Sequence, residues 1–252
     1  MAHKKSKIAL VTGGSRGLGK STVLALAKRG IESIFTYRSA KDEADKVVEQ
    51  TAKEGVKTIA LKLDTGNTGS FDDFVKAVKH ALTELGATKL DYLVNNAGIS
   101  HHKDLTETTE DELDQLYYVN FKGVFFLTQK LLPIIKDGGS IVNLATGLTR
   151  FCVPGSGAYA SLKGAIEVYT KYLAKELGPR GIRVNAVAPG TIHTDFSPGI
   201  YTPKFEKFIS GITALGRVGE PEDIGPMVAT LLSDDNHWMT AQRLEVSGGM
   251  FL

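Results

Sequence analysis

The sequence predicts an α/β fold in which a doubly wound parallel sheet of about seven strands carries helices on both faces. The first observation behind this prediction is that short runs of Val, Ile and Leu alternate with longer amphipathic segments. Strands of a parallel sheet are buried on both faces and need crossover connections, so they read as short apolar runs separated by helices. The second observation is a glycine-rich stretch directly after the first apolar run, where a tight turn into a helix is expected. Right-handed crossovers then distribute the helices over both faces of the sheet.

In the first half of the chain, apolar runs that favour strands alternate with segments whose apolar residues recur at helical spacing. The first run is IALVT, and a helix-like stretch follows its glycines; SIFTY is the next run, with a charged amphipathic segment behind it. The expected strands are residues 8–12, 33–37, 58–64 and 91–98, and the expected helices are residues 20–28, 41–53 and 71–85.

The same alternation continues through the second half. A long helical stretch over residues 110–135 leads to the strand SIVNLA at 140–145, and a helix over 157–177 leads to a strand over 183–189. A last short apolar run, residues 243–246, completes the sheet. No repeat, low-complexity tract or linker interrupts the chain, so we expect residues 1–252 to form one domain.

Residues 190–219 are the least regular part of the sequence and carry four aromatic residues between prolines and glycines. They follow the carboxyl end of a predicted strand, where open α/β sheets bind ligands. We therefore expect a substrate lid here; the alternative is a surface excursion with a small core of its own. The four aromatic residues are Phe196, Tyr201, Phe205 and Phe208.

Composition excludes several classes of protein. Lys and Arg number 30 against 28 Asp and Glu, so the net charge is +2, which gives no basic field for nucleic acid or a membrane surface. Cys152 is the single cysteine, which excludes an intramolecular disulfide and a multi-cysteine zinc site, and no metal is expected. The basic N-terminal residues precede an apolar run that is too short for a signal peptide or a spanning helix, so we expect a cytoplasmic protein.

The glycine-rich stretch reads TGGSRGLG over residues 12–19. Glycines let backbone N–H groups approach a pyrophosphate, and the N-terminus of the next helix adds partial positive charge. Between the first strand and first helix of a Rossmann-type sheet, the stretch therefore favours a dinucleotide over an unliganded turn. The candidate contacts in it are Gly13, Ser15, Arg16, Gly17, Leu18 and Gly19.

Further motifs stand in a specific order along nearly the whole chain. NNAG covers residues 95–98, Asn120 lies in the next helical stretch, YASLK contains Tyr159 and Lys163, and Pro189 and Gly190 follow the sixth strand. Together with the glycine stretch, they resemble the short-chain dehydrogenase/reductase family, and in particular its 3-oxoacyl-carrier-protein reductases and related ketoreductases. The resemblance implies a nicotinamide cofactor, with Asp64 near its adenine, although Asp64 could equally cap a helix. The remaining cofactor contacts that it implies are Asn96, Ala97, Gly98, Tyr159, Lys163, Pro189 and Gly190.

The second strand ends in Tyr37, Arg38 and Ser39, with no carboxylate to bind a ribose 2′-OH and repel a 2′-phosphate. Arg38 and Arg16 could instead clamp the 2′-phosphate through charge-assisted hydrogen bonds. We therefore expect NADP(H) to be preferred, with NAD(H) possible; the alternative is that both arginines are solvated surface residues.

Tyr159 and Lys163 are four residues apart, so in a helix their side chains share one face. An ammonium beside a tyrosine favours the phenolate, and the resemblance implies that Tyr159 exchanges a proton with the substrate oxygen. It also implies that Lys163 holds the ribose and that Asn120 anchors a water near Lys163. Thr146 stands thirteen residues before Tyr159, where this family has a serine; its hydroxyl offers the same donor and acceptors with an added methyl.

The expected function is therefore NADP(H)-dependent hydride transfer between the nicotinamide and a ketone or secondary alcohol, with a small-molecule substrate. The alternative is a catalytically weak nicotinamide-nucleotide sensor. A carrier-bound substrate would need a basic docking patch, for which Lys130 and Lys136 are weak candidates because Asp137 follows at once. Apolar residues on more than one face of the two longest helices predict a homo-oligomer, and the resemblance indicates a tetramer.

Overall fold

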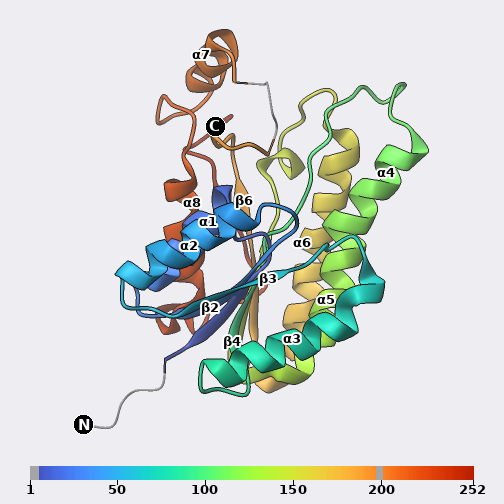
Figure 1. Ribbon diagram of the computed structural model, residues 1–252. Coiled ribbons are helices and arrows are strands. Elements are labelled where there is room, and N and C mark those ends of the chain that lie inside the picture. Colours follow the sequence, from blue (N-terminus) through green and yellow to red (C-terminus); the bar gives the residue numbers. More distant parts are fainter. Residues whose placement is uncertain (1–5, 197–200) are drawn as a thin grey trace.

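The computed structural model describes residues 6–196 and 201–252. Its centre is a seven-stranded sheet in the order β3-β2-β1-β4-β5-β6-β7, with every pair of neighbouring strands parallel. The doubly wound sheet expected from the sequence is therefore confirmed (Figure 1). The strands are β1 (Ile8–Val11), β2 (Glu32–Tyr37), β3 (Thr58–Lys62), β4 (Leu90–Asn95), β5 (Ile135–Leu144), β6 (Arg183–Pro189) and β7 (Arg243–Val246).

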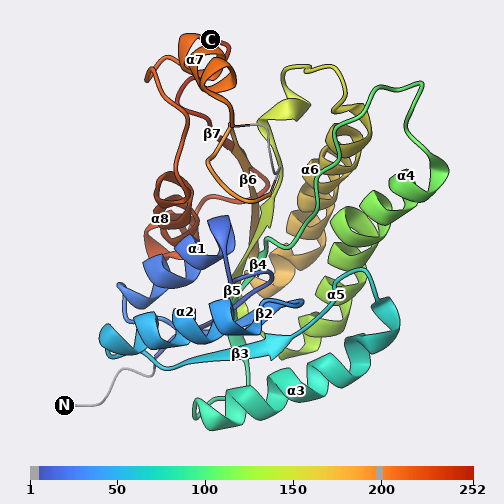
Figure 2. The same ribbon diagram turned by 45° about the horizontal axis from the view of Figure 1, so that its top comes forward.

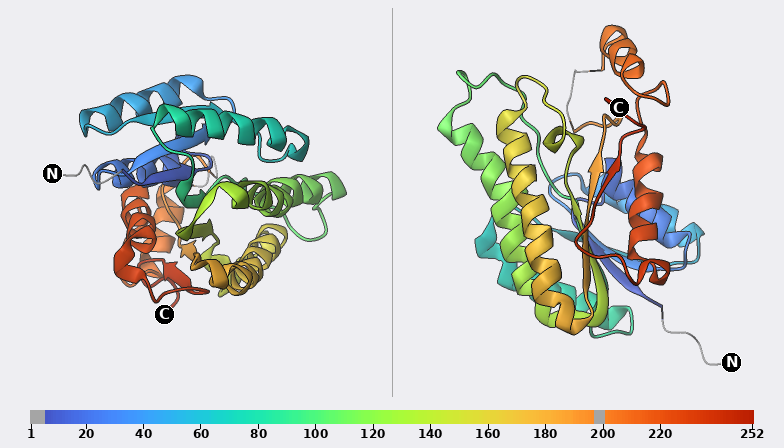
Figure 3. Two further views of the ribbon diagram at one scale, coloured as in Figure 1. Left: turned by 90° about the horizontal axis from the view of Figure 1, so that it is seen from below. Right: turned by 180° about the vertical axis from the view of Figure 1, so that it is seen from behind.

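Helices cover both faces of this sheet, as Figures 1 and 3 show. One face packs against α3, α5 and α6, and the opposite face packs against α1, α2 and α8. The α-helices are α1 (Gly17–Ala27), α2 (Lys41–Lys53), α3 (Phe71–Glu84), α4 (Glu110–Tyr117), α5 (Gly123–Leu131), α6 (Gly157–Leu177), α7 (Pro203–Gly211) and α8 (Pro221–Leu232).

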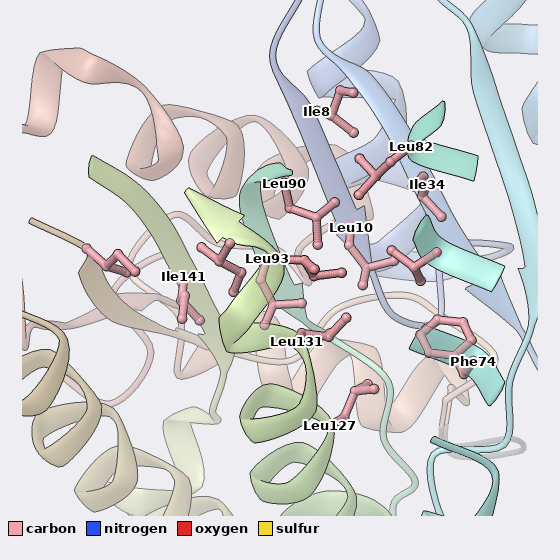
Figure 4. Close-up of a cluster of buried hydrophobic side chains, with 14 of the residues drawn as sticks. Ile8, Leu10, Ile34, Phe74, Leu82, Leu90, Leu93, Leu127, Leu131 and Ile141 are labelled. Atoms are coloured by element: carbon pink, nitrogen blue, oxygen red, sulfur yellow. The ribbon is translucent and has the colours of Figure 1, made fainter. Parts of the chain in front are cut away.

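Figure 4 shows how the first of these two cores is built. Leu10, Ile34 and Leu93 project from neighbouring strands, while Leu82 comes from α3 and Leu131 from α5. Each of these side chains is essentially removed from solvent. Full burial of such a side chain contributes about 1.5–3 kcal/mol, so the core holds both helices on the sheet.

Strand order reverses between β1 and β4, because β2 and β3 extend to one side of β1 and β5–β7 to the other. Open α/β sheets bind ligands at the carboxyl ends of the strands beside such a switch point. The glycine stretch follows β1 and NNAG ends β4, so the topology places both motifs at that point.

The expectation of one helix over residues 110–135 is wrong in detail. The segment consists of α4, a π-helical turn η2 (Tyr118–Lys122), α5 and a short 3₁₀ turn η3 (Leu132–Ile134). A π-turn keeps the backbone helical and replaces i→i+4 hydrogen bonds with i→i+5 bonds, so no helix-breaking residue marks it in the sequence. Asn120 lies inside this turn and is fully buried.

Other boundaries also differ from the sequence prediction. The helix after the glycine stretch begins at Gly17 rather than residue 20, and β5 begins at Ile135 rather than residue 140. Two helices were missed: α7, inside the expected lid, and α8, which starts with proline and contains a second proline, Pro226. Proline weakens a helical reading of sequence, but at the first turn it replaces an N–H that has no partner inside the helix.

Figure 2 shows α7 and the C-terminus at the end of the molecule to which the strands point. Ile209 of α7 packs with Val218 and Met250 in a small cluster separate from the two main cores. Within the described residues, no helix is long and apolar enough to cross a membrane, and no group of three or more His, Cys, Asp or Glu residues could hold a metal.

Candidate active site

The glycine stretch forms a close-packed cradle that leaves no room for side chains at two of its positions. A Cβ on Gly14 would lie 2.6 Å from the Cβ of Phe35, and a Cβ on Gly19 would lie 2.1 Å from the carbonyl oxygen of Gly13. Gly13 and Gly17 have φ values of +68° and +53°, which side chains disfavour. The first turn of α1 therefore presents bare backbone, as a bound pyrophosphate requires, and the residues present fit a dinucleotide.

Thr12 ties the cradle to the end of β4. Its hydroxyl accepts from the backbone N–H groups of Asn96 and Ala97 at 2.9 and 3.0 Å. The Asn96 side chain donates back to the carbonyl oxygens of Thr12 and Gly13 at 2.8 and 3.1 Å. These hydrogen bonds join the NNAG motif to the glycine stretch and form the floor of the cradle. Beside this floor, Ser15 is buried and Leu18 is half-buried.

The end of β2 lies against the same cradle, because the N–H of Gly14 donates to the carbonyl of Thr36 at 2.8 Å. This contact brings Tyr37, Arg38 and Ser39 to the edge where Arg16 emerges. Both arginines are exposed, and no hydrogen bond or ion pair with another described residue engages either guanidinium. Their charge is therefore available to an anion.

Asp64 follows β3 and is exposed at this same end of the sheet. Its carboxylate accepts from the N–H of Gly66 at 2.9 Å, which forms an Asx turn. The next helical turn begins at Thr68 with Asn67 before it, so the alternative that Asp64 caps a helix is wrong.

Tyr159 and Lys163 lie on the buried face of α6, one turn apart. Burial raises the pKa of the Tyr159 phenol, and a hydrogen bond with Thr146 partly offsets the rise. Burial also lowers the pKa of Lys163 to about 8. The Lys163 ammonium lies 5.8 Å from the centre of the Tyr159 ring and donates to the carbonyl of Leu144 at 2.7 Å.

Asn120 reaches the same region from the π-turn. Its amide accepts from the N–H of Ile99 at 3.1 Å and donates to the Ile99 carbonyl at 2.9 Å. A Cβ on Gly98 would lie 2.8 Å from Asn120 Oδ1 and 3.7 Å from Lys163 Nζ. The structure therefore brings Asn120 and Lys163 together around a glycine that cannot be larger.

Thr146 is buried at the end of β5, where it starts a 3₁₀ turn, η4 (Gly147–Thr149). Its hydroxyl accepts from the N–H of Leu148 at 3.3 Å, which fixes the side-chain rotamer beside Tyr159. Pro189 and Gly190 end the neighbouring strand, β6. A Cβ on Gly190 would lie 2.9 Å from the Cα of Ser247, so this glycine permits close approach of the segment after β7.

The sequence does not identify two residues that cover Tyr159 and fix its cover, Phe196 and Ser100. The ring of Phe196 stands edge-on to Tyr159 at 6.0 Å between ring centres. Its carbonyl accepts from the Ser100 hydroxyl at 2.8 Å, so the segment after β6 is fastened to the loop after β4. Phe196 had been noted only as one aromatic of the expected lid, and no local pattern links it to Ser100. Residues 197–200 of that lid lie outside the described residues.

His101 and His102 lie in the loop after β4, and each contacts another side chain. His102 Nδ1 lies 3.3 Å from the Ser156 hydroxyl. His101 Nε2 lies 3.3 Å from a Glu112 carboxylate oxygen, at an angle that makes no hydrogen bond. His101 is half-buried and His102 is exposed.

Comparison of the sequence with known protein families identifies the family of this protein. A family described as enoyl-(acyl carrier protein) reductase matches residues 13–251. The chain belongs to the short-chain dehydrogenase/reductase family. The resemblance seen in the sequence is thereby confirmed.

Known proteins are similar to this chain over nearly its whole length. The 3-oxoacyl-[acyl-carrier-protein] reductase FabG of Staphylococcus aureus is 37% identical over 251 residues, covering 99% of this chain and all of that protein. A short-chain dehydrogenase/reductase of Serratia marcescens is 34% identical, with a TM-score of 0.90 and coverage of 99% of this chain and 100% of that chain. The angucycline C-6 ketoreductase LanV with bound NADP is 36% identical, with a TM-score of 0.93 and coverage of 97% and 95%. The chain is thus an oxidoreductase of the short-chain family, acting between CH–OH groups and ketones with a nicotinamide cofactor.

Proposed function

We propose that this protein is an NADP(H)-dependent ketone reductase or secondary-alcohol dehydrogenase with Tyr159 as proton donor or acceptor. The observation that carries the proposal is the buried pair of Tyr159 and Lys163, with the buried Thr146 beside Tyr159 and Lys163 Nζ next to Gly98 of the NNAG motif. Residues 1–252 act as one cofactor-binding and catalytic domain, with 190–219 as its lid.

Tyr159 is the proton donor in ketone reduction. Its pKa is raised above the ordinary value of about 10, so the phenol is protonated at neutral pH. Lys163, with a pKa of about 8, is mostly charged at that pH, and its ammonium stabilises the phenolate that proton transfer leaves behind. When bound, the nicotinamide cofactor supplies the hydride for reduction or accepts it in oxidation.

Thr146 and Asn120 support this step differently. The Thr146 hydroxyl holds the substrate oxygen next to Tyr159, in the role of one oxyanion donor. Asn120 has both its side-chain oxygen and its nitrogen engaged by Ile99. One lone pair of its Oδ1 and one N–H of its Nδ2 are left for a water that Asn120 anchors near Lys163.

The cofactor is NADP(H) in preference to NAD(H). The exposed Arg16 and Arg38, with no competing carboxylate at the end of β2, support a 2′-phosphate there. The structural relatives LanV, with bound NADP, and a blue fluorescent protein from a metagenomic library, in complex with NADPH, agree with this choice.

The substrate is a small molecule rather than an acyl group on a carrier protein. Lys130 donates to Asp72 at 2.6 Å and Lys136 donates to Asp91 at 2.7 Å. Their charges are balanced locally, so this region lacks the unneutralised basic patch that would attract an acidic carrier.

The molecule assembles as a homotetramer. Val168 and Tyr172 of α6 are 53% and 65% exposed, and Trp238, before β7, is 94% exposed. These two apolar areas lie on different elements, and two different two-fold interfaces build a tetramer. Ile166 and Leu173 of the same helix are buried, and Leu173 packs in the core on the sheet.

The test is a panel of aliphatic, cyclic and aromatic ketones, followed by loss of nicotinamide absorbance with NADPH and NADH in parallel. We expect turnover of at least one class, with a higher kcat/KM for NADPH. Binding of NADPH without turnover of any ketone would favour the nucleotide sensor instead.

A further inference from the structure

Behind Thr146 lies a charged cluster, defined by Arg150, Glu167, Arg243 and Glu245, that the proposed mechanism does not use. Arg243 Nε donates to Glu167 at 2.8 Å and its Nη1 donates to Glu245 at 3.0 Å. Arg150 donates to both carboxylate oxygens of Glu245, at 2.6 and 2.7 Å. The two cations and two anions balance, and the four side chains join η4, α6 and β7.

Arg243 is the member of this cluster that contacts Thr146. Its Nη2 donates to the carbonyl oxygen of Thr146 at 3.1 Å and to the hydroxyl of Thr149 at 3.1 Å. The Thr149 hydroxyl lies 3.0 Å from that same carbonyl and 2.6 Å from Glu167. Arg243 is 97 residues from Thr146 in sequence, so only the fold brings them together.

We propose that Arg243 is a positioning residue, which holds the Thr146 main chain so that the Thr146 hydroxyl stays directed at Tyr159. This inference rests on the proposed role of Thr146 in ketone reduction. The Thr146 backbone is extended, with φ −158° and ψ 152°, and its hydroxyl already accepts from Leu148. Holding the carbonyl fixes the remaining freedom of the peptide plane. The guanidinium of Arg243 serves four acceptors at once from a rigid planar fork, whereas an ammonium has only three N–H donors.

Arg150 provides a matched control, because it shares the cluster without touching Thr146. It holds the C-terminal segment, donating to the carbonyls of Met250 and Phe251. Replacing either arginine should therefore lower the general stability of the cluster, whereas only replacing Arg243 should displace Thr146.

The experiment is a double-mutant cycle on kcat with Arg243→Met, Thr146→Val and the double variant, beside Arg150→Met. Misplacing a catalytic group by about 1 Å can cost up to about 10²-fold, so we expect Arg243→Met to lower kcat by about 10- to 100-fold with NADPH affinity unchanged. In the Thr146→Val background the same substitution should change kcat by less than about twofold, because the group it positions is gone. Arg150→Met should stay within about twofold of the wild type.

Equal losses in both backgrounds, wild-type kcat in Arg243→Met, or an equal loss in Arg150→Met would each overturn the proposal. Should Arg243→Met fail to fold, Thr149→Val takes its place in the cycle, since it removes the other donor beside the Thr146 carbonyl.

A readout without turnover separates this proposal from the proposed function. In protein labelled with ¹³Cζ-tyrosine, the Tyr159 resonance, assigned through Tyr159→Phe, reports its hydrogen bond. We expect Arg243→Met to shift it in the direction that Thr146→Val does, and Arg150→Met to leave it in place. An unmoved resonance in Arg243→Met overturns the positioning role, whereas inactive wild-type protein with the expected shifts counts against the proposed function alone.

Discussion

At the scale of single residues, burial makes Tyr159 and Lys163 chemically unequal. Burial raises the pKa of the phenol and lowers that of the ammonium to about 8, because a low-dielectric surrounding disfavours each charged form. At neutral pH the pair therefore stands as a neutral acid beside a cation. In the proposed mechanism, Tyr159 in this state protonates a ketone oxygen and the Lys163 ammonium stabilises the resulting phenolate.

Removing the Tyr159 hydroxyl tests that assignment. Tyr159→Phe keeps the ring and its packing, so we expect normal folding and NADPH affinity with kcat lowered by at least about 10²- to 10⁴-fold, the range for positioned acid–base groups. Thr146→Val should lower kcat by about 10²- to 10³-fold, as loss of one oxyanion donor does, and Thr146→Ser should retain most activity. Steady-state kcat and a separate cofactor titration measure these effects; near-normal turnover of Tyr159→Phe would refute the mechanism.

The exposed Arg38 tests cofactor choice. Arg38→Asp removes a charge-assisted hydrogen bond and places a like charge beside the 2′-phosphate, so we expect at least about 30-fold weaker NADPH binding, or about 2 kcal/mol. NADH binding should be unchanged or better. Fluorescence titration of both cofactors measures the ratio, and a wild-type preference for NADH would contradict this interpretation of the corner.

At the scale of elements, α1 and α8 are held together where their backbones touch. A Cβ on Gly225 of α8 would lie 2.4 Å from the carbonyl carbon of Ser21 of α1. Helix axes can approach this closely only over a glycine. The same contact supports the cofactor cradle, because α1 begins within the glycine stretch.

Gly225→Ala should therefore separate these helices. Overpacking of this kind costs about 1–3 kcal/mol, so we expect a lower urea midpoint and weaker NADPH binding. Gly211→Ala, in α7, meets no atom within 4 Å and should leave both unchanged. Equal midpoints for the two variants would show that α8 can shift without cost.

His193 connects α7 to the segment before α8 through contacts with two carboxylates. Its Nδ1 lies 2.7 Å from Glu220, before α8, and its Nε2 lies 3.2 Å from Glu206 of α7. The ring of Tyr201 packs on it edge-to-face at 4.9 Å. The hydrogen bond with Glu220, helped by Glu206, raises the pKa of His193 above its ordinary value.

This raised pKa predicts that α7 is held less firmly as pH rises. A group whose folded-state pKa is raised stabilises fully below its unfolded value, about 6.5 for histidine, and loses that contribution as pH passes the folded value. We expect amide protection factors in Pro203–Gly211 to fall as the pH rises above about 6.5 and passes through the raised pKa of His193, measured by hydrogen exchange corrected for intrinsic rates. His193→Gln should abolish this dependence; a fall that persists in the variant would assign it to another group.

At the scale of the whole molecule, several exposed aromatic residues lie on the helices α4, α5 and α6. Tyr117, Phe121, Phe125 and Tyr169 form a ladder of ring contacts along α4, α5 and α6. Part of this ladder stays accessible beside Tyr172. A monomer would leave that surface, and the edge strand β7 near Trp238, in contact with water.

Light scattering should thus give about four times the chain mass of 27.1 kDa. Tyr172→Glu and Trp238→Glu each place like charges across a different two-fold contact, so each single variant should yield dimers and the double variant monomers. A wild-type mass near 27.1 kDa at micromolar concentration would contradict the assembly.

Much of this fold can be predicted from the sequence, because it depends on interactions between residues close together in the chain. Apolar runs and their spacing predicted all seven strands, and the four-residue step from Tyr159 to Lys163 required only a helix to bring the two side chains to one face. The glycine stretch was likewise readable, because a turn from strand to helix around a phosphate demands small residues in sequence.

Tertiary structure alone decided the features that join distant segments. The contact of Arg243 with Thr146, the fastening of Phe196 by Ser100, and the close approach of Gly225 to Ser21 each join residues about 100 or more positions apart. No periodicity encodes such pairs, because they depend on strand order and crossover geometry, which place chain segments side by side only when the whole sheet has formed. The π-turn at Asn120 belongs with them, since no helix-breaking residue marks it in the sequence.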